Sequence, residues 1–152
     1  MNGAVAPSIL LVEDSASDAE MTLRALARPR LASSVHWVKD GAEALDYMFR
    51  EGPYAGRGAA APNLVLLDIK MPKVDGIEVL RRLKDDDRTR ATPVVMMTSS
   101  REPRDLVECY RHGANSYVVK PVAIDAYLRA VADVGLYWTA ANHAPGPGGG
   151  AA

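Results

Sequence analysis

Short runs of apolar residues alternate along the chain with longer segments in which apolar residues recur every three or four positions. The short runs are typical of β-strands, and the first, third and fourth are apolar throughout, as expected of strands buried on both faces. They lie at 9–12, 35–38, 64–67, 94–97 and 117–119. This alternation predicts an α/β fold in which helices cover both faces of a five-stranded parallel sheet.

Each intervening segment carries one apolar stripe, which predicts an amphipathic helix with one buried side. The stripes are Ala19, Leu23 and Leu26; Ala42, Leu45 and Phe49; Ile77, Leu80 and Leu83; Leu106 with Cys109 or Tyr110; and Ile124, Leu128 and Val131. Ser17 and Glu20 have the spacing of a capping box at the start of the first helix. Gly113 suits the end of the fourth helix. The predicted order is therefore five successive βα units, (βα)5.

One domain over 8–141, with a tail at each end, is the expected organisation. The final segment, 142–152, is rich in Gly and Pro and is expected to be disordered, and 1–7 forms a short N-terminal tail. The connection 51–62 is rich in Gly, Ala and Pro and is longer than most helix-to-strand loops. It is either a local feature of the fold or a surface for a partner.

Composition narrows the class of protein. A chain of 152 residues with 48% hydrophobic residues is large enough for one core without a disulfide or structural metal. The formal net charge of -1 gives no positive field to draw the chain onto nucleic acid or anionic lipid. No apolar run approaches the roughly 18 residues of a membrane span, and the start lacks the pattern of a signal peptide. Cys109 is the only cysteine and is expected to be a small buried side chain. We therefore expect a cytoplasmic protein without direct nucleic acid or membrane binding.

Polar side chains follow four of the predicted strands directly. Glu13 and Asp14 follow the first, Asp68 the third, Thr98 the fourth and Lys120 the fifth. The carboxyl ends of parallel strands meet at one edge of a sheet, where ligands bind at the point at which strand order reverses. Each residue alone is more often a solvated loop acid, a cap or a surface charge. Their joint placement predicts one site.

The residue types at this edge suit phosphoryl transfer to a carboxylate. Three converging carboxylates repel one another unless a cation lies among them, and oxygen ligands without His or Cys favour Mg2+. A carboxylate can attack phosphorus, and the transfer depends on positioning and charge neutralisation. Asp68, on the central strand, is the predicted acceptor. Lys120 and Thr98 would contact the phosphoryl oxygens.

The sequence resembles the receiver domains of bacterial two-component response regulators over roughly 8–141. The motifs that carry the resemblance are LLVEDS at 10–15, LLDIKMPKVDG at 66–76, VVMMTS at 94–99 and GANSYVVKP at 113–121. The resemblance implies a flavodoxin-like fold with strand order 2-1-3-4-5. It also implies that a sensor histidine kinase phosphorylates Asp68.

The same resemblance implies roles for further residues. Mg2+ would be held by Asp14, Asp68 and the backbone carbonyl of Lys70, with Glu13 assisting. Thr98 and Tyr117 would form the switch pair, in which the hydroxyl moves toward the phosphoryl group and the aromatic side chain turns inward. Tyr117 as a static, half-buried strand residue is the alternative. The Lys120–Pro121 bond resembles one that is cis in the family.

A narrower resemblance is to the stand-alone regulators paired with bacterial phytochromes. It rests on the loop containing EGPYAGRG and on the Tyr137-Trp138 pair that ends the last helix. Val122 stands where many receivers carry an aromatic residue, and Ser99 stands where a smaller one is common. Ser99 would alter the access of water to the phosphoryl group.

The last helix is expected to be apolar on two faces. One stripe comprises Ile124, Leu128, Val131 and Gly135, and the other comprises Tyr127, Ala130, Val134 and Tyr137. Only one helix and a tail follow the fifth strand, so output is expected through protein contacts. We expect a homodimer through the last helix, the fourth helix and the fifth strand, with Tyr127, Val134 and Tyr137 on the dimer face. The alternative is that both tyrosines simply lie on the surface.

Other functions explain the sequence less well. A phosphohydrolase that forms an aspartyl phosphate needs a second aspartate shortly after the nucleophile, where this chain has Lys70. A nucleotide-binding domain needs a Gly-rich turn after the first strand, where this chain has Glu13, Asp14 and Ser15. A scaffold that is never phosphorylated would not need so complete a site. Within the leading interpretation, a switch for a partner and an intermediate or sink in a phosphorelay both remain open.

Overall fold

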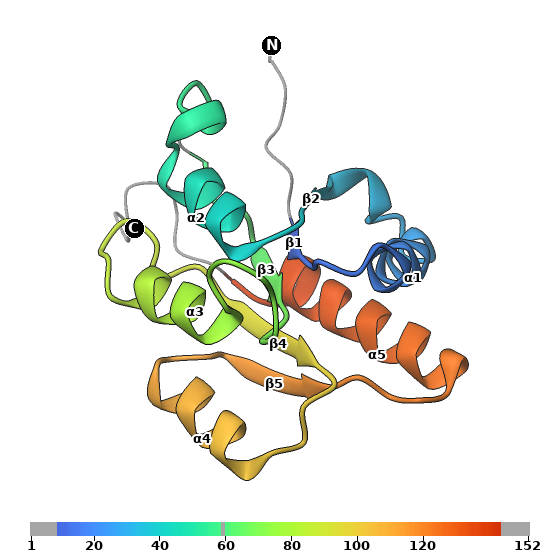
Figure 1. The fold of residues 1–152 in the computed structure, drawn as a ribbon. Coiled ribbons are helices and arrows are strands. Elements are labelled where there is room, and N and C mark those ends of the chain that lie inside the picture. The colour runs from blue at the N-terminus through green and yellow to red at the C-terminus, as the bar shows by residue number, and fades with distance from the viewer. Residues whose placement is uncertain (1–8, 59, 144–152) are drawn as a thin grey trace.

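The computed structural model describes residues 9–58 and 60–143. The predicted tail at 1–7 and most of the tail at 142–152 therefore lie outside the described residues. Five parallel strands form one sheet in the order β2-β1-β3-β4-β5 (Figure 1). The strands are β1 (Ile9–Val12), β2 (Val35–Val38), β3 (Leu64–Leu67), β4 (Val94–Thr98) and β5 (Ser116–Val119). This confirms the predicted flavodoxin-like fold and places β3 at the centre.

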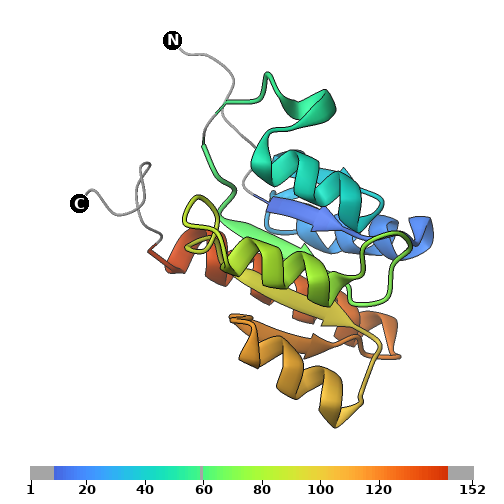
Figure 2. The same ribbon diagram turned by 60° about the vertical axis from the view of Figure 1, so that its left-hand side comes forward.

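Helices cover both faces of the sheet. The helices are α1 (Ala16–Ala27), α2 (Gly41–Phe49), α3 (Gly76–Lys84), α4 (Pro103–Arg111) and α5 (Ile124–Leu136), which continues as a π-helical segment (Tyr137–Ala141). Helices α1 and α5 lie side by side on one face, and α2, α3 and α4 cover the other (Figures 1 and 2). Two layers of helices therefore bury both faces of β1, β3 and β4.

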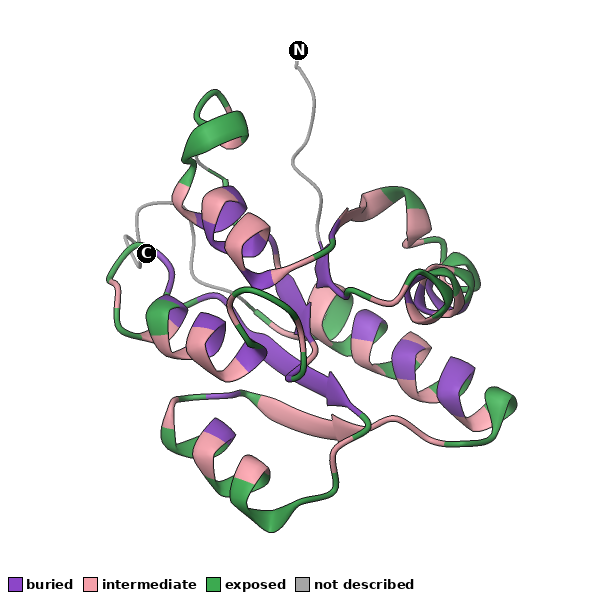
Figure 3. Cartoon of the chain, in the orientation of Figure 1, coloured by how far each residue is buried: buried purple, intermediate pink, exposed green. Residues whose placement is uncertain are grey.

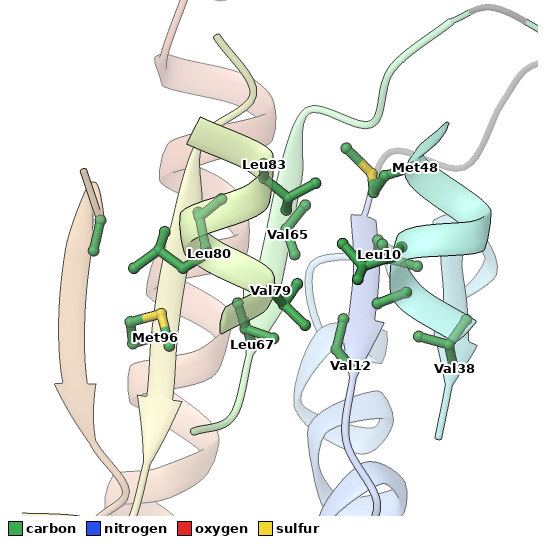
Figure 4. Close-up of a cluster of buried hydrophobic side chains, with 14 of the residues drawn as sticks. Leu10, Val12, Val38, Met48, Val65, Leu67, Val79, Leu80, Leu83 and Met96 are labelled. Carbon is green, nitrogen blue, oxygen red and sulfur yellow. The ribbon is translucent and has the colours of Figure 1, made fainter. Parts of the chain in front are cut away.

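The core consists of two hydrophobic clusters separated by the sheet. Alternate strand residues contribute to each, as in β1, where Leu10 and Val12 face α2 and α3 while Ile9 and Leu11 face α1 and α5. Figure 4 shows the first cluster, in which the side chains of Val79, Leu80 and Leu83 from α3 pack over the strands. Every residue of β1 and β3 is buried (Figure 3). Their carboxyl ends, which carry the predicted site, are therefore fixed by packing.

The start of α1 differs from the predicted capping box. Ser15, not Ser17, is the N-cap, and its side-chain oxygen accepts a hydrogen bond from the backbone N–H of Asp18 at 3.3 Å. The helix thus begins directly after the acidic turn that follows β1. Asp18 consequently lies in the first turn, close to the carboxyl edge of the sheet.

The prediction that Tyr127 lies on an outer face of α5 is wrong. The residue is only 4% exposed and belongs to the cluster between α5, α1 and the sheet. Its hydroxyl forms a hydrogen bond of 2.8 Å with the hydroxyl of Thr22 on α1. Ile124, which was predicted to face the sheet, is 57% exposed. Because α5 packs against both the sheet and α1, its buried arc extends to Tyr127.

The connection 51–62 is tied to the body of the fold. It contains a short 3-10 helix (Gly52–Tyr54) whose Tyr54 hydroxyl donates to a carboxylate oxygen of Glu43 at 2.8 Å and lies 3.0 Å from Nε2 of His36. Arg57 stacks on the ring of Tyr47 and donates to its carbonyl oxygen at 2.9 Å. The described part of this connection is thus a packed feature of the fold.

Candidate functional site

Three carboxylates converge at the carboxyl edge of the sheet. Glu13 and Asp14 follow β1, Asp68 follows β3, and one oxygen from each lies within 4.8 Å of the others. Strand order reverses between β1 and β3, so this is the switch point at which ligands bind in open α/β sheets. Opposite ligands of one Mg2+ ion are about 4 Å apart. The three side chains could therefore hold a hard divalent cation after small adjustments.

The ammonium group of Lys120 closes the other side of this cluster. Its Nζ donates to Oε1 of Glu13 at 2.8 Å, to Oδ2 of Asp18 at 2.9 Å and to Oδ2 of Asp68 at 3.2 Å. The side chains of Lys120 and Glu13 are only 9% and 4% exposed. Lys120 is therefore held as a buried cation directly beside Asp68.

The charges at the site stabilise one another against burial. Burial by itself would lower the pKa of Lys120, but the hydrogen bond and charge of Glu13 and the charge of Asp68 outweigh it and raise that pKa. Burial raises the pKa of Glu13, while its contact with Lys120 acts in the opposite direction. The pKa of Glu13 is raised overall, so the ion pair with Lys120 offsets only part of the cost of burying this acidic side chain within the cluster.

The loop after β3 is shaped to present Asp68. Oδ1 of Asp68 accepts a hydrogen bond from the backbone N–H of Ile69 at 2.7 Å, and the N–H of Gly76 donates to the carbonyl of Ile69 at 2.7 Å. A groove beside Asp14 is lined by residues of this loop, including Lys70 and Met71. Asp68 is therefore oriented by local hydrogen bonds next to an open approach from solvent.

Thr98 and Tyr117 lie on the neighbouring strands. Thr98 ends β4, is only 1% exposed, and its hydroxyl accepts a hydrogen bond from the N–H of Ser100 at 3.2 Å. Tyr117, on β5, is half-buried and donates its hydroxyl to the carbonyl of Ser100 at 3.1 Å. Both side chains are thus fastened to the same residue of the β4–α4 loop.

The Lys120–Pro121 peptide bond is trans, contrary to the form that the family resemblance implied. The two isomers of an X–Pro bond differ by only about 0.5–1 kcal/mol, so the dipeptide does not determine the isomer.

Two contacts at the site were missed by sequence reasoning. Asp18 reaches Lys120 from the first turn of α1, and the indole N–H of Trp37 donates to the carbonyl oxygen of Glu13 at 2.8 Å. The rule that looks just beyond strand ends does not include either position. The available signal for Asp18 was the presence of an acid four residues after Asp14. The first turn of a helix that starts directly after Asp14 lies close to the sheet edge.

Comparison with known proteins agrees with this architecture. The model of the response regulator receiver domain family matches residues 9–132 of this chain. A curated relative, the probable methanogenesis regulatory protein FilR2 of Methanothrix harundinacea, is 41% identical over 139 residues, which cover 91% of this chain and 88% of the relative. The chain is thus similar to this relative along nearly its whole length.

Solved structures with the same fold include regulators linked to phytochromes. The phosphorylated cyanobacterial phytochrome response regulator RcpA superposes with a TM-score of 0.86 at 32% identity, covering 93% of this chain and 100% of that chain. The bacteriophytochrome response regulator AtBRR has a TM-score of 0.72 at 48% identity, covering 92% and 100%. The Mn(2+)-bound form of the response regulator Rcp1 has a TM-score of 0.84 at 30% identity, covering 91% and 98%.

Proposed function

Because the chain belongs to the response regulator receiver domain family, we propose that it is a signalling switch that accepts a phosphoryl group on Asp68. The observation that carries this proposal is the placement of Asp68 between two further carboxylates and the buried ammonium of Lys120. The carboxylate would attack phosphorus as the bond from phosphorus to the donor breaks. The protein is then not an enzyme for an external substrate, since the group it transfers ends on its own side chain.

Mg2+ is the proposed cofactor. Asp14, Asp68 and the backbone carbonyl of Lys70 would hold it, with Glu13 assisting. The clustered carboxylate oxygens support this, as does the Mn2+ bound in the related regulator Rcp1. When bound, the ion supplies positive charge that neutralises the carboxylates and the phosphoryl oxygens. The same charge is required before a phosphate group can approach three acidic side chains.

The residues around Asp68 would have separate tasks. Lys120 already lies 3.2 Å from Oδ2 of Asp68, so it needs only a small movement to contact a phosphoryl oxygen. Thr98 would contact another such oxygen, which requires its hydroxyl to leave the N–H of Ser100. Ser100 also holds Tyr117, so that movement would release the tyrosine hydroxyl. This shared contact favours the switch role of Tyr117 over the static one.

The proposed donor is a sensor histidine kinase of a bacterial phytochrome. The support is the similarity to the phytochrome response regulators RcpA and AtBRR, which covers 93% and 92% of this chain. FilR2, a regulator of another kind by its name, is the reason to test the donor directly. Transfer from a phytochrome kinase should respond to red and far-red light. Transfer from the phytochrome kinase at a rate that is the same in red and far-red light, or no transfer from it, would contradict this pairing.

The cytoplasmic location stays a prediction.

The face formed by α4, β5 and α5 is the proposed surface for a second copy of the chain. Leu106, Val107 and Tyr110 on α4 are 39%, 55% and 50% exposed, and the adjoining Val122 is 94% exposed. Tyr137, beyond α5, is 53% exposed, whereas Tyr127 is buried and drops out of this face. Val134 is half-buried against the core.

None of the helices in the described ranges is long and apolar enough to cross a lipid bilayer.

The oligomeric state tests this surface. Size-exclusion chromatography with light scattering should show a dimer for the chain, and Val107→Glu should weaken it. Glu20→Gln, on the far helix α1, is the control. A monomer at every concentration, with and without phosphorylation, would remove the dimer.

Phosphorylation itself is tested by Phos-tag electrophoresis after incubation with acetyl phosphate. A shifted band should form with Mg2+, and it should be absent with EDTA and in Asp68→Asn. A band of equal intensity in Asp68→Asn would place the phosphoryl group elsewhere. Absence of a band in the native chain, with acetyl phosphate and with a histidine kinase, would favour a scaffold.

A further inference from the structure

Asp18 contacts Lys120 from outside the cluster of three carboxylates. Its Oδ2 lies 2.9 Å from Nζ of Lys120, nearly as close as Oε1 of Glu13 at 2.8 Å. The side chain of Asp18 is 40% exposed, whereas that of Lys120 is 9% exposed. Asp18 therefore holds the buried ammonium from the solvent side.

All three donors of the ammonium group are used in this arrangement. Lysine can donate three hydrogen bonds, and Lys120 donates one each to Glu13, Asp18 and Asp68. A phosphoryl oxygen that approaches Lys120 must therefore share or replace one of these partners. Asp18 is the partner that neither accepts the phosphoryl group nor belongs to the carboxylate cluster that could hold a metal ion.

The position of Asp18 is fixed by the start of α1. Ser15 caps the helix by accepting from the backbone N–H of Asp18, which leaves the carboxylate of Asp18 free to reach across to the end of β5. Asp18 contributes only its main-chain N–H to this hydrogen bond, and the acceptor is the side-chain oxygen of Ser15. Replacement of the side chain therefore leaves the cap intact.

We infer that Asp18 is a positioning residue that acts through Lys120 to strengthen Mg2+ binding and to weaken the hold on the phosphoryl group. The inference rests on the proposed function of the site. A carboxylate next to the cluster attracts a divalent cation and repels a phosphoryl dianion, and it competes with that dianion for Lys120. The contact between Lys120 and Glu13 does not involve Asp18, so we expect Lys120 to keep its position when Asp18 is neutral.

Opposite effects on two ligands distinguish this role from a structural one. Mg2+ affinity can be measured by calorimetry, and affinity for beryllofluoride, a phosphoryl analogue, by fluorine NMR at saturating Mg2+. Asp18→Asn is expected to weaken Mg2+ binding and to tighten beryllofluoride binding, each by about threefold to tenfold for one partly screened charge. Asp18→Ala should likewise weaken Mg2+ binding and tighten beryllofluoride binding.

Glu20→Gln is the matched control, because it removes an exposed carboxylate from the same helix. It should change both affinities by less than about twofold at this greater screening. Weakened binding of both ligands in Asp18→Asn would mean that the contact is structural, and unchanged affinities would mean that it has no role. Either result overturns the inference while the native chain still binds both ligands. Failure of the native chain to bind them overturns the proposed function and the inference together.

Discussion

The backbone carbonyl of Asp68 lies against Gly76, the first residue of α3. A Cβ atom added to Gly76 would overlap the carbonyl oxygen of Asp68 and lie 2.7 Å from its carbonyl carbon. The N-terminus of α3 can therefore approach the end of β3 only because residue 76 has no side chain. This close approach holds the loop between them, and with it the acceptor carboxylate.

Replacement of Gly76 by alanine should displace Asp68 and destabilise the fold. The methyl group meets backbone atoms that cannot move aside easily, so we expect a loss of about 1–3 kcal/mol in the free energy of unfolding. Urea denaturation measures this loss, and acetyl phosphate labelling should also slow. Gly56→Ala is the control, because no heavy atom lies within 4 Å of its added Cβ. Equal stability of Gly76→Ala and the native chain would contradict the role of this contact.

The buried hydrogen bond between Thr22 and Tyr127 joins α1 to α5. Tyr127→Phe and Thr22→Val each remove one hydroxyl and leave the other without its partner, so each should lower the free energy of unfolding by about 1–3 kcal/mol. The double variant should lose less than the sum of the two, with a coupling of about 1 kcal/mol in a double-mutant cycle. If Tyr127→Phe instead altered dimerisation without lowering the free energy of unfolding, Tyr127 would lie on an outer face of α5.

The fold and most of the site could be predicted because both depend on simple patterns. Strands β1 and β3 are apolar throughout, which is required of strands covered on both faces, and their ends fix where Glu13, Asp14 and Asp68 meet. Lys120 follows the same rule at the end of β5. These residues were found because parallel strands end at a shared edge.

The errors concern helix faces that are shared between neighbours. Helix α5 contacts both the sheet and α1. Periodicity shows which residues lie on one side of a helix without showing how many neighbours cover it. A tyrosine is compatible both with a solvent-exposed surface and with a core that offers its hydroxyl a hydrogen-bond partner. The residue type therefore did not indicate that Tyr127 is buried. Asp18 was missed for a related reason, since its partner lies 102 residues away.

Lys84 ties together the segments that lead into β4 and β5. Its Nζ donates to the carbonyl oxygens of Arg90 and Thr92 at 3.0 and 2.8 Å and to Oδ1 of Asn115 at 3.0 Å. Lys84→Met removes these bonds to a charged donor and should lower the free energy of unfolding by about 1.5–3 kcal/mol in urea denaturation. Lys73→Met, whose side chain is 69% exposed, should change it by less than about 0.5 kcal/mol. Similar losses in both variants would show that the network does not stabilise the fold.

Tyr54 should make the stability of the 51–62 connection depend on alkaline pH. Burial and the hydrogen bond to Glu43 raise the pKa of Tyr54 from 10.0 to about 12. Because the pKa is higher in the folded state, the folded chain retains a proton that the unfolded chain loses between these two values. The stabilisation is therefore complete below pH 10 and is lost as the pH rises toward 12.

The variant Tyr54→Phe isolates this contribution. Below pH 10 it should be less stable than the native chain by about 1 kcal/mol in urea denaturation, since it lacks the hydrogen bond to Glu43. The difference should shrink as the pH rises above 10, because the unfolded native chain is then stabilised by losing the Tyr54 proton while the folded chain still retains it. A difference for Tyr54→Phe that stays constant from pH 8 to pH 11 would show that the Tyr54 hydroxyl is not held in this contact.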